Sequence, residues 1–354
     1  MGSTMLRAVR FDALTARELD AWHSLRAANP ALDSPYFHPG FAAAVHASGR
    51  EVRVVVHTDE AGNVVGLLPC HRDRSLLKPA GWPASDFQGP ITAPGTTFPA
   101  HELLAGGVRS FEFDHLITDC AGFDPWIISR RPSPFLDTTG GMEGYLGRAS
   151  RSGKENMGQA RRRAAKAERE HGTVRFVAES CDQDALDGLV ALKRGQYAAT
   201  GARDYFAQPG RRELLAGLLG TRDAAFGGVL STLHVGSRLV AAHFGLRSGG
   251  VLHWWFPAYD PAFAHMAPGW ILLRELVLAA PAMGVTRIDL GRGEDEYKRR
   301  AKTGETLVCQ GIVAKTSVHS VLRRARDSTI AAAKASPLGP GLRKAARKIR
   351  AITG

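Results

Sequence analysis

Residues that could do chemistry gather in one stretch of the chain, residues 251–298. An aromatic strand pattern at 251–256 leads through a turn-rich loop to Ala-Pro-Gly at 267–269, which starts an apolar helix that Gly284 ends. Pro in the first turn and Gly after the last are typical of helix boundaries. The unpaired N–H groups of a helix start beside a strand end can bind a phosphate or another anion. The alternative is a helix cap that holds no ligand.

A carboxylate follows this helix at the end of a short strand pattern. Strand alternation places Asp289 on the face opposite Ile288 and on the same face as Arg287. A carboxylate at a strand end could orient an amine or act as a general base in acyl transfer. The alternatives are an ion pair between Arg287 and Asp289, or a turn cap.

Five further polar residues, Glu296, Tyr297, Lys298, His243 and His253, are candidates for the same site. Glu296, in a short acidic run, could face an acceptor, although solvated acids are the common outcome. Lys298, next to Tyr297, could hold a phosphate or a carboxylate. His243 and His253 lie on adjacent expected strands, where either could take up a proton near neutral pH. The alternative for each histidine is a buried, hydrogen-bonded side chain.

The aromatic residues of the stretch could line a channel for the acceptor or belong to the core. Trp254 and Trp255 cannot face the same way because strand residues alternate, and Tyr259 follows them. The 13 histidines show no H-x-x-x-H or H-E-x-x-H spacing, and no G-x-S-x-G is present. A metal site and a serine hydrolase are therefore disfavoured, and no metal cofactor is expected.

Composition indicates a globular protein with an anionic partner. The chain has 354 residues, of which 44% are hydrophobic, and a net charge of +12. Residues 148–171 and 321–354 carry charges of +5 and +8, so the remainder is nearly neutral. Such segments suit a phosphate-bearing cofactor, tRNA, acidic lipid or an anionic glycan. Four widely spaced cysteines and the lack of a signal-peptide pattern predict a cytoplasmic protein.

Alternating strand and helix patterns predict an α/β (α+β) fold, and a repeat predicts two similar domains. Three features recur at offsets of 175, 174 and 175 residues: a hairpin strand from Val64 and Leu239, Ala-Pro-Gly at 93–95 and 267–269, and an apolar-Asp pair at 113–114 and 288–289. Pro99 disfavours a helix directly after the first Ala-Pro-Gly. The second copy is therefore expected to hold the cofactor, and the first to shape the acceptor site.

Two basic segments lie outside this unit. Ser152-x-x-Glu155 is a capping-box pattern, which predicts a basic helix from Ser152 to the pair His171-Gly172. Arg162 belongs to its cationic face, which could bind an anionic partner or simply be solvated. The tail at 317–349 is a candidate basic amphipathic helix that could touch acidic membrane lipid or be flexible.

Residues 254–298 resemble the C-terminal half of the GNAT-type acyltransferases associated with cellulose and exopolysaccharide biosynthesis. These are relatives of the Fem-type peptidyltransferases, which carry two GNAT domains in one chain. The matching residues are His253-Trp254-Trp255, Tyr259-Asp260, Pro268-Gly269, Leu272-Leu273, Asp289-Leu290-Gly291, Gly293, Glu296 and Tyr297-Lys298. The chain departs from the usual GNAT pattern Arg/Gln-x-x-Gly-x-Gly/Ala, which weakens the case for coenzyme A.

The resemblance implies two tandem GNAT-like domains, each a mixed twisted sheet flanked by helices. We expect a degenerate N-terminal domain at 5–150, a basic junction helix at 151–172, a C-terminal GNAT domain at 173–318 and a basic tail at 319–354. The resemblance also implies a pyrophosphate loop beside a splayed strand whose backbone N–H groups face the thioester carbonyl. The loop would consist of His265, Met266, Ala267, Pro268, Gly269 and Trp270.

Three hypotheses for function follow. The preferred one is an acyltransferase that moves an acyl group from acyl-CoA, most simply acetyl-CoA, to an amine or hydroxyl of a small molecule, polysaccharide or envelope precursor. The second is an aminoacyl-tRNA-dependent, Fem-like peptidyltransferase, for which the basic helix would serve tRNA. The third is a non-catalytic protein that binds an anionic polymer or a membrane surface.

Overall fold

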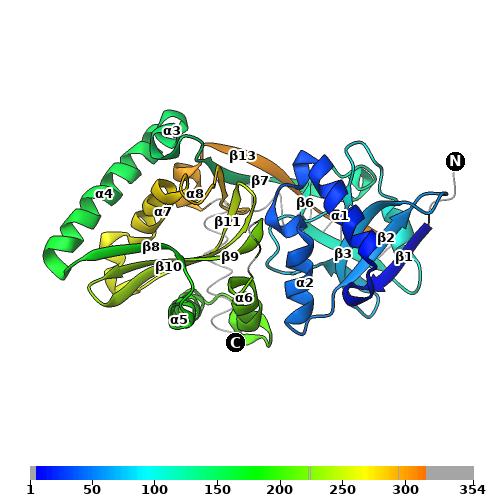
Figure 1. Cartoon of the computed structure of the whole chain (residues 1–354), viewed down its shortest axis with the longest axis horizontal. Coiled ribbons are helices and arrows are strands. Elements are labelled where there is room, and N and C mark those ends of the chain that lie inside the picture. Colours follow the sequence, from blue (N-terminus) through cyan, green and yellow to red (C-terminus); the bar gives the residue numbers. More distant parts are fainter. Residues whose placement is uncertain (1–4, 222, 224, 294, 316–354) are drawn as a thin grey trace.

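The computed structural model describes residues 5–221, 223, 225–293 and 295–315. One long twisted sheet runs through both halves of the elongated molecule, with helices on its faces (Figure 1). The strand order is β1-β2-β3-β4-β6-β13-β7-β12-β11-β10-β9-β8, and β5 pairs with β3. The predicted α/β fold with two GNAT-like units is confirmed. Among the described residues, no helix combines the length and the apolar character that a bilayer crossing requires.

The two halves repeat one arrangement. In each, an antiparallel set of three strands is interrupted by two helices between its first and second strand. The first set comprises β1 (Met5–Arg10), α1 (Ala16–Ala28), α2 (Pro39–Ala47), β2 (Arg53–Thr58) and β3 (Val64–Asp73). The second comprises β8 (Val174–Ser180), α5 (Gln183–Thr200), α6 (Arg211–Leu219), β9 (Phe226–Val235) and β10 (Arg238–Ser248).

The remaining elements differ between the halves. The first half continues with β4 (Leu76–Pro79), β5 (Ile91–Thr92), the 3-10 helix η4 (Ala100–Leu104), β6 (Ser110–Ile117) and β7 (Ile127–Asp137). After α3 (Gly141–Arg148) and α4 (Arg151–His171), the second half adds β11 (Val251–Tyr259), the 3-10 helix η7 (Pro261–Met266), α7 (Pro268–Ala279), β12 (Arg287–Asp289), α8 (Glu296–Ala301) and β13 (Gly304–Ala314). The α-helix after Ala-Pro-Gly thus exists only in the second half, since η4 replaces it in the first.

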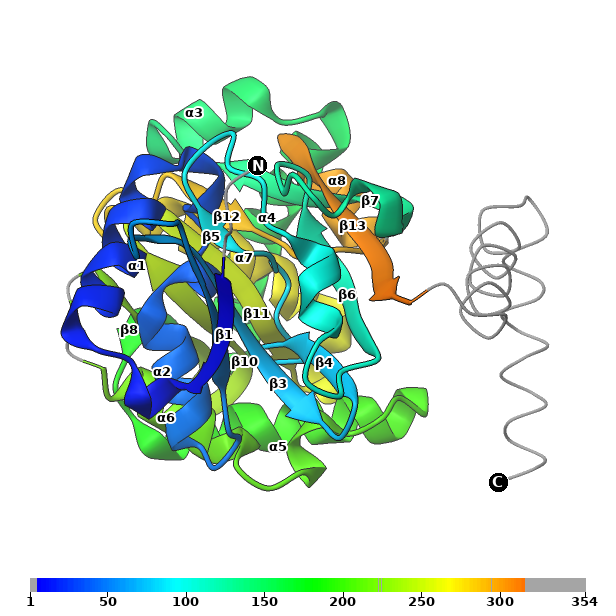
Figure 2. The same ribbon diagram turned by 90° about the vertical axis from the view of Figure 1, so that its right-hand side faces the viewer.

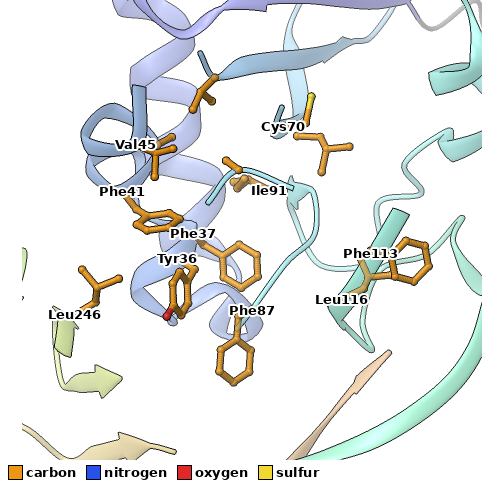
Figure 3. Packing of buried hydrophobic residues seen from close by; sticks show 14 of the residues in the cluster. Tyr36, Phe37, Phe41, Val45, Cys70, Phe87, Ile91, Phe113, Leu116 and Leu246 are labelled. Atoms are coloured by element: carbon orange, nitrogen blue, oxygen red, sulfur yellow. The ribbon is translucent and has the colours of Figure 1, made fainter. Parts of the chain in front are cut away.

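The halves share strands rather than meeting at a simple boundary. The last strand, β13, inserts between β6 and β7 and pairs antiparallel with both (Figure 2). The next strand after β7 is β12, from the second half. A continuous core crosses the junction as well, since Tyr36 and Phe41 belong to one cluster with Leu246 (Figure 3). The rings of Tyr36 and Phe41 also contact the indole ring of Trp255. Each half is therefore completed by the other.

The expected start of the basic helix at Ser152 and the expected capping box with Glu155 were both wrong. The basic helix α4 begins at Arg151 with Ser150 as its N-cap, whose hydroxyl accepts from Gly153 N–H. Glu155 does not complete a capping box, since its carboxylate pairs with Arg151. The end of the helix at Gly172 is as expected.

Strand β7 was missed because it contains Pro132 and Pro134, which normally argue against a strand. The two prolines are two residues apart, so their backbone nitrogens point to the same edge of β7. The carbonyl of Pro134 accepts from Leu290 N–H on the side of β12. Because β12 pairs only with Phe135–Asp137, the missing N–H groups of the prolines break no ladder there.

Candidate active site

Strand β11 carries a bulge where it parts from β12. Trp254 and Trp255 of β11 together face the single residue Gly245 of β10. A Cβ at Gly245 would lie 2.5 Å from both His243 Cε1 and His253 O, so only Gly fits opposite the bulge. On its other edge, β11 pairs with β12 only up to His253. Within the described residues, that edge has no strand partner farther along, so β11 and β12 diverge.

A cavity of about 560 Å³ lies between the diverging strands and the start of α7. Its walls come from a loop of the first half and from α5, β11, η7, α7 and the residues around α8. The lining residues are Asp86, Lys193, Gln196, Trp254, Trp255, Pro257, Ala258, Tyr259, Ala264, Ala267, Pro268, Gly269, Trp270, Leu272, Leu273, Leu290, Asp295, Tyr297 and Lys298. The structure thus brings the expected loop, the aromatic strand and the Tyr-Lys pair to one space.

The start of α7 offers only a few free backbone donors. Ala267 adopts a left-handed conformation (φ 49°, ψ 57°), and its carbonyl accepts from Trp270 N–H at 2.9 Å. Pro268 has no N–H, so Gly269 contributes the donor of the first turn that has no acceptor within its own helix. A Cβ on Gly269 would meet no atom within 4 Å, so a ligand can approach its backbone closely.

Asp86, from the first half, brings a carboxylate into the cavity. Its Oδ2 lies 3.0 Å from His253 Nε2 on β11, and its Oδ1 lies 3.3 Å from His115 Nε2 on β6. Burial alone would raise the pKa of Asp86, but His115, His253 and Lys298 outweigh it and hold that pKa well below its usual range. Asp86 is therefore ionised at neutral pH, and its side chain is 26% exposed towards the cavity.

A second layer of contacts fixes this carboxylate. His115 Nδ1 lies 2.8 Å from Asp114 Oδ1, so the ring bridges Asp114 and Asp86. Gln88 Nε2 donates to Asp114 Oδ1 at 2.9 Å, and Gln88 Oε1 accepts from the backbone N–H of Asp114. Arg292, from the second half, donates to the carbonyl of Asp114 at 2.6 Å. The position of Asp86 is thus set by residues of both halves.

Lys193 of α5 is the lining cation whose charge is most sensitive to pH. Its Nζ donates to the carbonyl of Pro257 at 2.9 Å, on the open edge of β11. Burial, together with the nearby charge of Lys298, lowers the pKa of Lys193 to about 8. Lys298 itself donates to the carbonyls of Gly291 and Arg292 at 3.3 and 3.1 Å, which ties it to the turn after β12. Burial raises the pKa of Tyr297, which therefore stays protonated.

The structure places Asp289 outside the cavity. Its side chain is 2% exposed, and its Oδ1 accepts from Arg287 Nε at 3.0 Å. Arg287 also binds Asp33 of the first half at 2.6 Å. Burial raises the pKa of Asp289 although Arg287 opposes it. The ion pair that the sequence left open as an alternative is present, while Leu290, the next residue, lines the cavity.

The two histidines do not face each other directly, because His243 pairs with Pro257 and His253 with Leu246. His243 is fully buried, its ring stacks on Trp254 at 4.1 Å, and burial lowers its pKa to about 3. His253 is equally buried but reaches the cavity through Asp86. Trp254 and Trp255 belong to different core clusters, so their side chains diverge as expected.

The other expected residues do not line the cavity. Glu296 on α8 pairs with Arg300 and points to solvent. Met266 is buried in the core, and the exposed ring of His265 lies 6.2 Å from that of His171, at the end of α4. Arg162 is exposed on α4, which packs along α7.

Asp86 and Lys193 were not found from the sequence. Asp86 lies in a Gly- and Pro-rich loop, 167 residues from its partner His253. Lys193 lies on a helix whose neighbouring Arg194 is an ordinary exposed cation, paired with Asp204. No local pattern distinguishes either residue from its neighbours. Among the described residues, no group of three or more His, Cys, Asp or Glu side chains could hold a metal ion.

Comparisons with known proteins give the same fold. The structure of FemX superposes with a TM-score of 0.57 at 9% identity, covering 91% of this chain and all of FemX. A C-terminal domain described as that of a lysylphosphatidylglycerol synthetase from Agrobacterium fabrum gives 0.53 at 11% identity, with 89% and 96% covered. L-PGS from Bacillus licheniformis gives 0.52 at 12% identity, with 88% and 96% covered. At these identities the likeness shows the fold alone.

A family model assigns the half that holds the cavity. Residues 154–299 match the family described as acetyltransferase (GNAT) domain. A comparison with curated protein sequences finds no match. The matched range runs from α4 through α8 and so contains the bulged strand, the start of α7 and the Tyr-Lys pair. Residues 154–299 thus match a GNAT-type acetyltransferase domain, and the expectation that the chain is an acyltransferase is confirmed.

Proposed function

We propose that the protein transfers an acyl group from acyl-CoA to an acceptor that Asp86 holds. The observation that carries the proposal is the cavity between β11, β12 and α7, which combines an anion-accepting helix start with an ionised carboxylate and a lysine of lowered pKa. GNAT domains take an acyl-CoA thioester as donor, and acetyl-CoA is the simplest. The diphosphate would lie at Gly269 and the thioester along the open edge of β11.

The reaction needs a proton acceptor for the incoming nucleophile. Asp86 is a poor base because its pKa is held low, and Tyr297 is a poor one because it stays protonated. Lys298 is held by two carbonyls. Lys193, with a pKa of about 8, is the lining group that changes charge nearest neutrality. We assign the base to Lys193 and the binding of a cationic acceptor to Asp86.

The chemical step can then be written in balance. An acceptor amine that arrives as an ammonium ion gives one proton to the neutral amine of Lys193. Its nitrogen forms the new bond to the thioester carbon, the C–S bond breaks, and a second proton from nitrogen goes to the departing thiolate. Lys193 returns its proton to water. A hydroxyl acceptor would follow the same course with a single proton, taken up by Lys193 and passed to the thiolate.

A second donor is favoured by the exposed cations of α4. Arg161, Arg162 and Arg169 are exposed and have no ion pair within the part of the chain that the structure describes. Helix α4 packs along α7 and touches η7, which directly precedes the start of α7. An aminoacyl-tRNA donor is the alternative that this surface supports.

The test is ligand binding with a matched pair of variants. Acetyl-CoA should raise the Tm at fixed ionic strength, because a ligand that binds the native state stabilises it by mass action. Gly269→Asp should abolish that shift by placing a negative charge where the diphosphate lies. Gly147→Asp, at another helical glycine with open space around it, should retain it. A shift that survives in Gly269→Asp, or that high salt removes, would contradict the proposed site.

The alternative donor gives a different pattern. If acetyl-CoA leaves the Tm unchanged while aminoacyl-tRNA supports transfer, the tRNA-dependent reaction is the right one. Charge reversal at Arg161 and Arg162 should then abolish transfer, whereas an acyl-CoA reaction on a small acceptor should tolerate it. An acceptor from a polysaccharide or envelope precursor, and contact of the basic tail with a membrane, remain predictions. The tail at 317–349 lies outside the described residues.

A further inference from the structure

A buried arginine and a half-buried one lie at the junction of the halves, and neither lines the reaction cavity. Arg211 is the first residue of α6, is 7% exposed, and lies with its Cζ 4.5 Å from the centre of the Tyr205 ring. Arg50, from the first half, donates through Nη2 to the carbonyl of Trp82 at 2.7 Å. Gly210, the N-cap of α6, packs so closely against the carbonyl of Ser48 that an added Cβ would lie 2.1 Å from it, which brings the start of α6 to within two residues of Arg50. Burial and the charge of Arg211 lower the pKa of Arg50 to about 10.

Neutral groups surround these two cations. Arg211 Nη1 donates to the hydroxyl of Tyr205 at 3.2 Å. His71 is held between the carbonyl of Glu51 and the N–H of Gly81, and burial, with the charges of both arginines, lowers its pKa to about 4. His71 is therefore uncharged at neutral pH. Within the described residues, neither arginine forms an ion pair with a carboxylate.

The cluster also has hydrogen-bond donors to spare. Arg50 Nη1 and Arg211 Nε are both buried and have no acceptor among the described residues. Helix α6 begins at this point with Gly210 as its N-cap and no capping side chain, so its positive end adds to the two charges. A buried cation, a half-buried one and a helix start, without a counter-charge among the described residues, carry a desolvation cost that an anion would offset.

We infer that Arg50, Arg211 and the start of α6 bind a small oxyanion, a phosphate or a carboxylate, between the two halves. The spare Nη1 and Nε donors would bond its oxygens. The anion would also reach the reaction cavity through one segment: Arg50 holds Trp82 O, Trp255 Nε1 donates to Ala84 O at 2.7 Å, and Asp86 follows two residues later. An anion here would therefore stiffen the loop that carries Asp86.

The test measures thermal stability of the whole chain against inorganic phosphate and, separately, acetate, with chloride holding the ionic strength constant. Wild-type protein should gain at least about 2 °C in Tm with phosphate or acetate. Arg211→Met and Arg50→Met should each lose the gain while folding normally without added anion, since removal of one of two like charges relieves repulsion. Arg212→Met is the control: Arg212 is exposed on the same helix and pairs with Asp187.

Each outcome of this test either supports or contradicts the anion site at Arg50 and Arg211. A gain that Arg212→Met retains and both other variants lose supports the site, and its size with phosphate against acetate identifies the preferred anion. If Arg211→Met fails to fold, Arg50→Met decides, because Arg50 reaches the cluster from the other half. No gain in the wild type, or an equal gain in Arg211→Met or Arg50→Met, would overturn the inference.

Discussion

The role of Lys193 can be tested through the pH dependence of acyl transfer. With a pKa of about 8, roughly 9% of Lys193 is the neutral amine at pH 7. An ordinary lysine, with a pKa of about 10.5, is only about 0.03% neutral at that pH. The lowered pKa of this partly buried lysine therefore increases its neutral fraction about 300-fold. We expect kcat/KM to rise about tenfold per pH unit below pH 8 and to level off above it.

Two variants separate a base from a positive charge at this place. Lys193→Met removes both and should lower kcat/KM by about 100-fold or more, with loss of the pH step. Lys193→Arg keeps a cation that can donate to Pro257 O but cannot lose its proton near neutrality. It should be as inactive as Lys193→Met and equally free of the step. A hydroxyl acceptor, which gives its single proton to Lys193 and does not itself titrate near pH 8, keeps the titration of the substrate out of this range.

A rate that falls through pH 8 would refute this reasoning. It would mean that the ammonium form of Lys193 is active, as a donor to the developing oxyanion, and Lys193→Arg would then retain activity. A step that persists in Lys193→Met would assign the titration to another group. Circular dichroism across the pH range checks that the profile reflects chemistry and not unfolding.

Three further predictions concern other residues. Asp86→Asn should lower kcat/KM for an amine acceptor by about 100-fold, while calorimetry should show unchanged binding of acetyl-CoA. The control is Glu296→Gln, at a solvent-facing carboxylate, which should change kcat/KM less than about twofold. Equal effects of the two variants would contradict the role of Asp86. His243 has a native pKa of about 3 and takes up a proton on unfolding below pH 6.5, so the free energy of unfolding should fall by about 2 kcal/mol from pH 7 to pH 5. His243→Gln should reduce this pH dependence in urea unfolding. An unchanged pH dependence would show that His243 is not its cause. Asp289→Asn should lower the Tm by breaking the buried pair with Arg287 while kcat/KM per folded molecule stays the same; a loss of kcat in fully folded protein would instead restore Asp289 as a catalytic group.

Repetition in the sequence predicted the fold better than local propensity did. The repeated features that begin at Val64 and Leu239 lie on β3 and β10, and those at Phe113 and Ile288 lie on β6 and β12. Each pair consists of corresponding strands of the two halves. Local signals failed where tertiary pairing overrides them. Pro132 and Pro134 argued against a strand, but their nitrogens face an edge of β7 where no N–H donor is needed. At α4, Ser150 is the N-cap residue in place of Ser152.

The divergent strands and the start of α7 were predictable because they are local. The residues that form each of them lie close together in the sequence. The bulge at Trp254 also requires Gly245 on the neighbouring strand β10. The groups that give the cavity its charge were not predictable. Asp86 depends on His253 and His115, which lie on β11 and β6, and the pKa of Lys193 depends on burial that α5 acquires only on folding.

The first half contributes Asp86 to the cavity but has no α-helix after its own Ala-Pro-Gly. After Ala-Pro-Gly at 93–95 the chain enters η4, and the fully buried ring of Phe98 stacks on Phe123. Aromatic packing thus replaces the open helix start. The loop that precedes this turn instead extends across the junction and brings Asp86 to His253. Because β13 pairs with β6 and β7, separating the halves would remove a strand from the first and the carboxylate from the second. We therefore expect residues 151–315 alone to lack transferase activity, even though they contain the whole match to the acetyltransferase domain.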